Sequence, residues 1–213
     1  MTHSRSPLTR WQRIEKRSFD LMVAVGALGC LWPFLVVAWV VCAIDTGASG
    51  CFRQVRIGRN GDPFDVLKLR TMADRPGTSV TTAADSRITR SGAVLRALKV
   101  DELPQLWNVI RGEMSLVGPR PDVPGFADTL TGPDRVILSV RPGITGPASL
   151  TFRHEERLLV GVEDPESYNR EVIWPAKVRV NREYVANWSF KGDLAYLWLT
   201  LASSGVGNKP EDS

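Results

Sequence analysis

The sequence predicts an α-rich α/β protein, in which an apolar N-terminal helix precedes a small domain with a short β-hairpin and several helices. Three observations predict this class. Residues 21–44 form a run of 24 residues without a charge. The dipeptide Asn60-Gly61, favoured in tight hairpin turns, lies between two strand-like pieces. Apolar residues then recur at helical spacing over residues 103–110.

The chain has 213 residues, which is enough for one domain with a hydrophobic core and an anchor. We expect a basic N-terminal segment at 1–20, the apolar helix at 21–44, one domain at 45–200 and a flexible tail at 201–213. Lys and Arg outnumber Asp and Glu by 27 to 23. This excess suits an anionic partner but does not choose among nucleic acid, lipid headgroups and phosphorylated metabolites.

The cysteine and histidine content limits the chemistry. There are three cysteines, an odd number, without Cys-x-x-Cys spacing, so neither a disulfide framework nor a zinc site is expected. Of the two histidines, His3 lies near the N-terminus, so a Ser-His-Asp triad could use only His154. Carboxylates are therefore the better candidates for acid–base or nucleophilic chemistry.

The apolar run is long enough to span a bilayer as a straight helix, and it lacks the cleavage pattern of a secretory signal. Pro33 divides it into halves, neither of which alone can cross about 30 Å of hydrocarbon. Basic residues, which mark the cytoplasmic side, flank the run at both ends. A kinked spanning helix and a helix that bends and leaves on the same side both remain open, beside a buried core helix as a third reading.

After the run, residues 52–72 read as the two strands of the hairpin, and alternation puts Lys68 and Arg70 on one face with Phe64 and Val66. Residues 75–87 are small and polar and predict a loop. Residues 92–98 predict a short helix, with Arg96 on its polar side.

An adjacent acid pair, Asp101 and Glu102, precedes the helix predicted at 103–110. Gly112 is a natural stop for that helix. Asp101 fits its N-cap, Pro104 is tolerated in its first turn, and Glu102 there would be favoured by the helix dipole. On residue types alone, the pair reads as an ordinary helix start.

Two Pro-rich loops follow, and each contains an arginine. Prolines on both sides of Arg120 hold it in an extended loop, which suits bidentate contact with a phosphate. Arg141 begins a Pro-Gly turn. The C-terminal third predicts a helix over 165–185, broken at Pro175, and a second helix in 188–203. The aromatic residues Trp188, Tyr196 and Trp198 of the latter fit either a membrane interface or core packing.

Several of these pieces, taken in order, resemble one family. They are "KRSFD", "FRQVRIGRNGDPF", "KLRTM", "DELPQLWNVIRGEMSLVGPRP", "RPGITG" and "YVANWS". Together they resemble the bacterial sugar transferases, specifically the small monotopic phosphoglycosyl transferases, over about residues 13–200. The resemblance implies a re-entrant membrane helix bent at Pro33, a small cytosolic domain with some helices at the membrane interface, and a location at the cytoplasmic face of the bacterial inner membrane.

The resemblance also implies a reaction. A sugar phosphate moves from a UDP-sugar to a polyprenyl phosphate such as undecaprenyl phosphate, UMP is released, and magnesium is required. In the matching positions, Asp101 would be the nucleophile that forms an acyl phosphate, and Glu102, with Asp101, would hold the magnesium ion. A carboxylate can attack phosphorus only where the surrounding negative charge is neutralised.

Further residues match the family by position. Lys68, Arg96 and Arg120 match basic residues of its active site, and Arg70 and Arg141 are weaker matches. Lys16 and Arg17 match the motif at which the helix enters the membrane, and Asp20 is a candidate partner for them. Nucleic acid is not an expected partner, and a homodimer stays an open alternative.

Three positions depart from the pattern of many members: Trp32 stands for Ser, Pro147-Ala148-Ser149 for Trp-Ala-Gln, and Asn181 for Asp. These departures limit inference about the sugar, not about the chemistry. Two other functions compete. A non-catalytic membrane protein with a lipid-binding basic face would explain the charge but not the acid pair. A glycosyltransferase that moves only the sugar would release UDP, and no Asp-x-Asp motif supports it.

Overall fold

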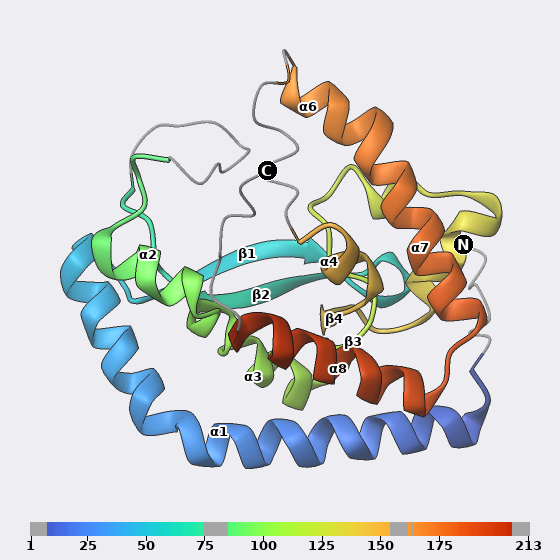
Figure 1. Ribbon diagram of the computed structural model, residues 1–213, viewed down its shortest axis with the longest axis horizontal. Coiled ribbons are helices and arrows are strands. Elements are labelled where there is room, and N and C mark those ends of the chain that lie inside the picture. Colours follow the sequence, from blue (N-terminus) through green and yellow to red (C-terminus); the bar gives the residue numbers. More distant parts are fainter. Residues whose placement is uncertain (1–7, 75–84, 154–161, 163, 206–213) are drawn as a thin grey trace, which may run out of the picture.

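The N-terminal helix α1 (Arg10–Thr46) is the longest element of the computed structural model, which describes residues 8–74, 85–153, 162 and 164–205. Thr9 and Gln12 form a reciprocal capping box at its start, and Gly47, at a φ of 65°, ends it. The helix continues through Pro33. Because proline lacks an N–H and its ring crowds the preceding turn, it bends a helix, and Figure 1 shows α1 bending around the domain.

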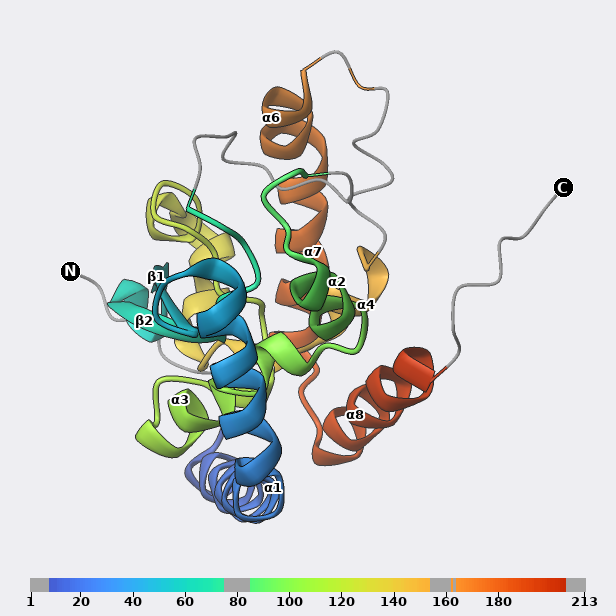
Figure 2. The ribbon, with the colours of Figure 1, turned by 90° about the vertical axis from the view of Figure 1, so that its left-hand side faces the viewer.

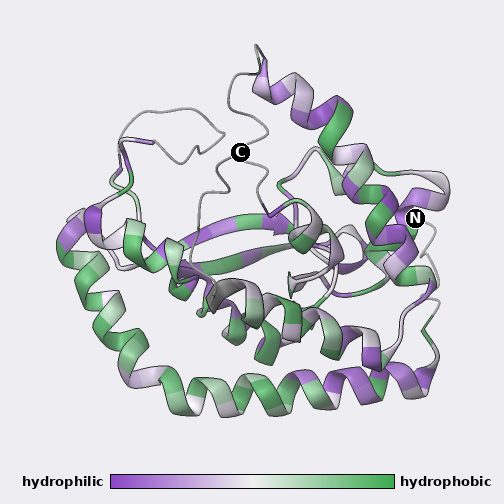
Figure 3. Ribbon diagram, in the orientation of Figure 1, coloured by the Kyte–Doolittle hydropathy of each residue, from purple (hydrophilic) through white to green (hydrophobic). Residues whose placement is uncertain are grey.

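The middle of α1 is exposed and apolar. In the part of the chain that the structure describes, α1 is the one helix long and apolar enough to cross a membrane, and only 11% of its most apolar window is buried. Figure 3 shows the apolar stretch in green along the bend. Its exposed side chains include Trp32, Phe34 and Val37, so this helix is not the buried core helix of the third reading.

Both ends of α1 are fixed to the same domain. In the first half, the Arg17 guanidinium donates to the carbonyls of Val109 (2.6 Å) and Ile110 (3.0 Å) at the end of helix α3 (Gln105–Arg111). In the second half, Ala38 and Cys42 form a small core with Leu69 of the hairpin. A straight spanning helix would place these two ends on opposite sides of a membrane, whereas here both ends contact the same domain.

The predicted hairpin is confirmed. Strands β1 (Cys51–Ile57) and β2 (Pro63–Leu69) pair antiparallel, from Cys51 opposite Leu69 to Ile57 opposite Pro63. The connection is longer than a two-residue turn, because a 3₁₀ turn at Arg59–Gly61 intervenes. Asn60 and Gly61 adopt positive φ values of 63° and 92°, the property for which the dipeptide is favoured.

A second, parallel sheet joins β3 (Ser115–Val117) to β4 (Gly143–Thr145). A Cβ atom on Gly143 would lie 2.1 Å from the Gly118 nitrogen, so only glycine permits this close approach of the two loops that carry Arg120 and Arg141. The main core lies between α3, the two sheets and the C-terminal helices, and Val66, Val109 and Met114 are among its fully buried side chains.

The remaining helices follow the sequence closely, with one correction. Helix α2 (Arg90–Ala97) forms where a short helix was expected, and α4 (Pro147–Thr151) follows β4. The break predicted at Pro175 is wrong. Helix α6 (Pro165–Tyr168), a π-helical turn at Asn169–Ile173 and α7 (Trp174–Ala186) are contiguous, because the wider turn before the proline relieves the clash of its ring.

The last helix, α8 (Phe190–Gly205), begins against the first half of α1, where the Phe19 and Phe190 ring centroids lie 5.1 Å apart, and then runs away from it (Figure 2). The aromatic residues in α8 and just before it differ in burial. Trp188 and Tyr196 pack against the main core, whereas Trp198 is 71% exposed. The expected loop at 75–87 falls mostly outside the described residues. Of the flexible tail expected at 201–213, residues 201–205 belong to α8 instead, and the rest lies outside the described residues.

A buried polar cluster joins α1 to α8. Asp193, 2% exposed, accepts hydrogen bonds from Lys16 (2.5 Å), Tyr184 (2.8 Å) and Trp188 (3.0 Å). Lys16 also donates to the Val117 carbonyl of β3 at 2.9 Å. The cluster therefore fixes the start of α1 to the C-terminal helices and to the second sheet.

We expect Asp193→Ala to lower the free energy of unfolding by about 3–5 kcal/mol, because it leaves the Lys16 ammonium buried without its carboxylate. Asp134→Ala is the matched control. It breaks the exposed Arg182–Asp134 pair, in which both side chains are more than 40% exposed, and should cost less than about 1 kcal/mol. Chemical denaturation of the detergent-solubilised proteins measures both values, and similar losses in the two variants would contradict this assignment.

Candidate active site

The acid pair lies on a 3₁₀ turn, Val100–Glu102, between α2 and α3. Lys99 opens this turn with a φ of 58°, a left-handed conformation that is costly for a residue with a side chain. The prediction that Asp101 caps the following helix is wrong, since α3 begins at Gln105 and its N-cap, Pro104, makes no side-chain bond. The inserted turn moves the pair out of the helix and toward the hairpin.

Asp101 is a buried carboxylate with an unsatisfied oxygen. Asp101 is only 7% exposed, and its Oδ1 atom has no hydrogen-bond partner. Burial raises the pKa of Asp101 above its ordinary value, and the charge of Glu102 adds to the rise. The cations Lys68, Arg96 and Lys99 act in the opposite direction. A buried acceptor without a donor is costly in a folded protein, so this atom is a strong candidate for chemistry.

Glu102 is in the opposite situation. Its Oε1 accepts from Lys68 Nζ at 3.2 Å and from Arg120 Nη2 at 2.9 Å. Burial alone would raise the pKa of Glu102, but Arg120, Lys68 and Lys99 outweigh it and lower the value to about 2. Glu102 therefore stays ionised and holds two cations in place, while its neighbour keeps a free oxygen.

The three basic residues that the resemblance matches most strongly, Lys68, Arg96 and Arg120, act on this acid pair. Lys68 comes from β2, where burial lowers the pKa of its ammonium, and Arg120 comes from the loop after β3. Arg96 of α2 donates to the Met72 sulfur at 3.8 Å and contributes to the potential at Asp101. Strand, loop and helix thus converge on one point.

The two weaker candidates lie elsewhere. Arg70 donates to the Ser49 carbonyl at 2.8 Å and stacks over the Phe52 ring. Arg141 donates to the Gly112 carbonyl at 2.7 Å, and the charges that shift its pKa, after burial, are Arg17, Arg59 and Asp20. Neither contact brings these arginines to the acid pair.

The three polar residues expected at the membrane entry all contact the domain. Arg17 holds the end of α3, as described above. Lys16 forms its ion pair with Asp193, not with Asp20. Asp20 accepts from the Leu116 backbone N–H at 3.1 Å, and burial raises the pKa of its carboxyl. All three therefore fix the start of α1 to the core.

Sequence reasoning missed Arg56 and Gln105. Together with Lys68 and Arg120, these residues line an open pocket beside the acid pair. The hairpin register supplies the signal that could have found Arg56. Gln54 faces Val66 and Arg56 faces Phe64, so Arg56 lies on the strand face already assigned to Lys68.

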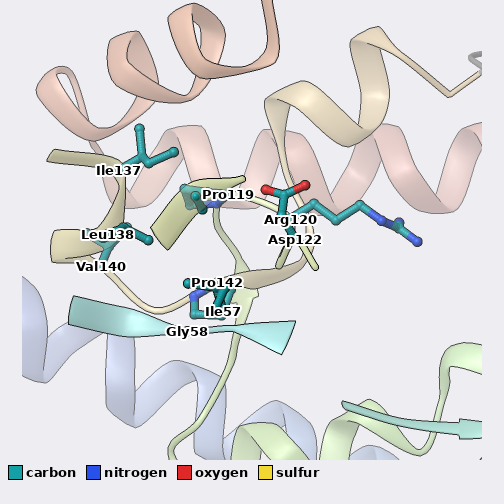
Figure 4. Close-up of a pocket in the computed structure, with 10 residues that line it drawn as sticks. Ile57, Gly58, Pro119, Arg120, Asp122, Ile137, Leu138, Val140 and Pro142 are labelled. Carbon is teal, nitrogen blue, oxygen red and sulfur yellow. The ribbon is translucent and has the colours of Figure 1, made fainter. Parts of the chain in front are cut away.

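A second pocket lies on the other side of the Arg120 loop (Figure 4). Ile137, Leu138 and Val140 form its apolar wall, and the Arg120 side chain points away from them. Arg120 therefore lines this pocket at its edge, while its guanidinium is directed to Glu102 of the acid pair.

The donor set fits the expected magnesium ion. In residues 8–74, 85–153 and 164–205, no group of three or more His, Cys, Asp or Glu side chains forms a metal cage. Magnesium, however, is commonly bound by one or two carboxylates together with water and substrate phosphates. Asp101 and Glu102 offer that number of carboxylates, and the unsatisfied Oδ1 of Asp101 is an available ligand atom.

The chain is similar to known sugar transferases over most of its length. The chain is 36% identical over 198 residues to an uncharacterized sugar transferase, EpsL, of Bacillus subtilis (strain 168), covering 91% of this chain and 90% of the relative. It is 37% identical to an undecaprenyl-phosphate glucose phosphotransferase of Komagataeibacter xylinus, covering 92% of this chain but only 37% of that longer protein.

A third relative is the UDP-glucose:undecaprenyl-phosphate glucose-1-phosphate transferase of Caulobacter vibrioides. It is 35% identical to the chain, and the match covers 89% of this chain and 69% of the relative. The family model described as bacterial sugar transferase matches residues 11–206, which include all of α1 but its first residue, the acid pair and α8. The chain therefore belongs to the bacterial sugar transferase family.

Proposed function

We propose that the protein transfers a sugar-1-phosphate from a UDP-sugar to undecaprenyl phosphate, with Asp101 as nucleophile, as a membrane-bound step of glycoconjugate synthesis. The single observation that carries the proposal is the buried Asp101 oxygen without a partner, beside a glutamate that holds two cations. The names of the relatives, which specify undecaprenyl phosphate and in one case UDP-glucose, support the substrates.

The first half of the reaction uses Asp101 directly. A carboxylate oxygen attacks the phosphorus that bears the sugar, a new P–O bond forms, and the bond to the second phosphate breaks, so that UMP leaves with the bonding electrons. Lys68 and Arg120, already fixed on Glu102, lie where they can neutralise the diphosphate. The product is an acyl phosphate on Asp101 that carries the sugar.

The second half returns the enzyme to its starting state. A phosphate oxygen of undecaprenyl phosphate attacks the same phosphorus, and Asp101 departs as a carboxylate. Two steps at one phosphorus let a soluble donor and a lipid acceptor use the site in turn. A magnesium ion held by Asp101, Glu102 and the substrate phosphates would supply charge neutralisation for both steps.

The two attachments of α1 support a re-entrant arrangement. Because Arg17 and Lys16 hold its first half and Cys42 its second half on one domain, both ends lie on the same side of any membrane. The exposed apolar bend around Pro33 is then the part that enters the bilayer. The exposed Trp198 of α8 supports an interfacial position for that helix at the cytoplasmic face.

Asp101→Asn should abolish UMP release in an assay with magnesium, undecaprenyl phosphate and a panel of UDP-sugars, because an amide cannot act as the nucleophile. The free energy of unfolding should stay the same or rise, since the exchange removes a poorly solvated charge. Asp134→Asn, at the exposed pair used above, should turn over like the wild type. A normal rate in Asp101→Asn would rule out this nucleophile, and release of UDP instead of UMP would indicate transfer of the sugar alone.

Cysteines placed at exposed Arg10 and Asp62 test the path of α1. In a variant without Cys30, Cys42 and Cys51, both introduced thiols should react with a membrane-impermeant reagent in inside-out vesicles, and neither in right-side-out vesicles. Reaction of the two thiols from opposite faces would exclude the re-entrant arrangement and favour a spanning helix.

A further inference from the structure

The pocket beside the acid pair has a cationic wall that the two steps above do not fully use. Arg56, Lys68 and Arg120 line it together with Gln105, whose side chain is buried. Asp101 is not among its lining residues. Because Lys68 and Arg120 of this wall contact Glu102, which adjoins Asp101, a diphosphate that presents one phosphorus to Asp101 can reach the wall with its second phosphate.

Arg56 donates hydrogen bonds to uncharged acceptors. Nε and Nη2 donate to the Gln54 amide oxygen at 3.2 and 2.7 Å, and Nη1 donates to the Pro121 carbonyl at 3.3 Å. All of these acceptors are neutral, and the carboxylates of Asp122 and Glu102 act on the guanidinium through their charge alone. Two of its five N–H groups remain beyond those that these bonds use.

The bond to Pro121 fixes the residue next to Arg120. One position further along, the Ile57 N–H donates to the Asp122 carbonyl at 2.8 Å. Strand β1 therefore holds the Arg120 loop at two consecutive points, one through a side chain and one through the backbone. On the other side, Arg120 reaches Glu102 at 2.9 Å, so the strand, the loop and the acid pair form one chain of contacts.

The electrostatics of the pocket favour an anion. Burial lowers the pKa of Arg56, and the neighbouring Arg120 charge lowers it further, since two close cations in a poorly solvated site repel each other. Across the whole site, three carboxylates, Asp101, Glu102 and Asp122, face five cations, Arg56, Lys68, Arg96, Lys99 and Arg120. Before any metal ion binds, the side chains therefore carry an excess of two positive charges, which favours an anion.

We propose that the pocket bounded by Arg56, Lys68 and Arg120 receives the phosphate that departs with the nucleoside, and that Arg56 is the positioning residue that holds Arg120 against it. The inference rests on the proposed function. Asp101 attacks the phosphate that bears the sugar. The phosphate that bears the nucleoside is assigned to a different set of residues, those of the pocket.

Arg56→Lys tests the inference because it keeps the charge but cannot bond Gln54 and Pro121 together. With a UDP-sugar that the wild type accepts, the KM for that donor and the inhibition constant of UMP should each rise roughly tenfold, the effect of losing a charged hydrogen-bond network. The KM for undecaprenyl phosphate should not change, since the acceptor arrives after UMP has left.

Arg135→Lys is the matched control. Arg135 also donates its guanidinium to two backbone carbonyls, those of Leu130 and Asn60, on the far side of the hairpin turn. In Arg135→Lys, the KM for the donor, the KM for undecaprenyl phosphate and the inhibition constant of UMP should equal those of the wild type. Partial misfolding of either variant lowers kcat by reducing the active fraction, but it leaves KM and the inhibition constant unchanged, so a merely structural role gives a different result.

Two results separate the inference from the proposed function. If the wild type releases UMP and Arg56→Lys has donor and UMP constants within twofold of it, the inference is overturned while the function stands. An equal rise in the KM for undecaprenyl phosphate would also overturn it, because the pocket would then serve both substrates. If the wild type releases no UMP from any donor, the proposed function itself fails.

Discussion

Lys68 and Arg120 bind Glu102, and this pairing determines what its neighbour Asp101 can do. Two adjacent carboxylates repel each other, so both can be ionised only where cations offset the charge. Here the cations sit on Glu102 and lower its pKa to about 2, while Asp101 is buried with an oxygen that has no hydrogen-bond partner. One acid therefore organises the site and the other stays available as a reactive group.

Hydrogen bonds and packing contacts also connect the site to α1. Carbonyls at the end of α3 accept hydrogen bonds from Arg17, and a carbonyl of β3 accepts one from Lys16. The start of α1 is therefore fixed to α3, which follows the acid pair, and to β3, which precedes the Arg120 loop. The second half of α1 packs on Leu69, next to Lys68 on β2. A bend around Pro33 lets one helix contact the domain with both of its halves.

Much of this arrangement could be predicted from local pattern. The charge-free run, the Asn60-Gly61 hairpin and the Gly112 helix stop each depend on residues close in sequence, and all three are confirmed. The N-cap role of Asp101 was wrong, because Lys99 takes a left-handed conformation that no local rule requires. The role of Arg56 was missed since it depends on contact with Pro121, which is 65 residues away. The ion pair of Lys16 with Asp193 joins opposite ends of the chain.

The central claim is that Asp101 carries the sugar phosphate between the two substrates. The direct measurement is a rapid-quench experiment with donor and magnesium but without undecaprenyl phosphate, followed by mass spectrometry of the peptide that contains Asp101. The account predicts a burst of about one UMP per active site and a sugar-phosphate adduct on Asp101, because the first half needs no acceptor. UMP release that strictly requires the acceptor, without any adduct, would contradict it and indicate direct transfer between the bound substrates.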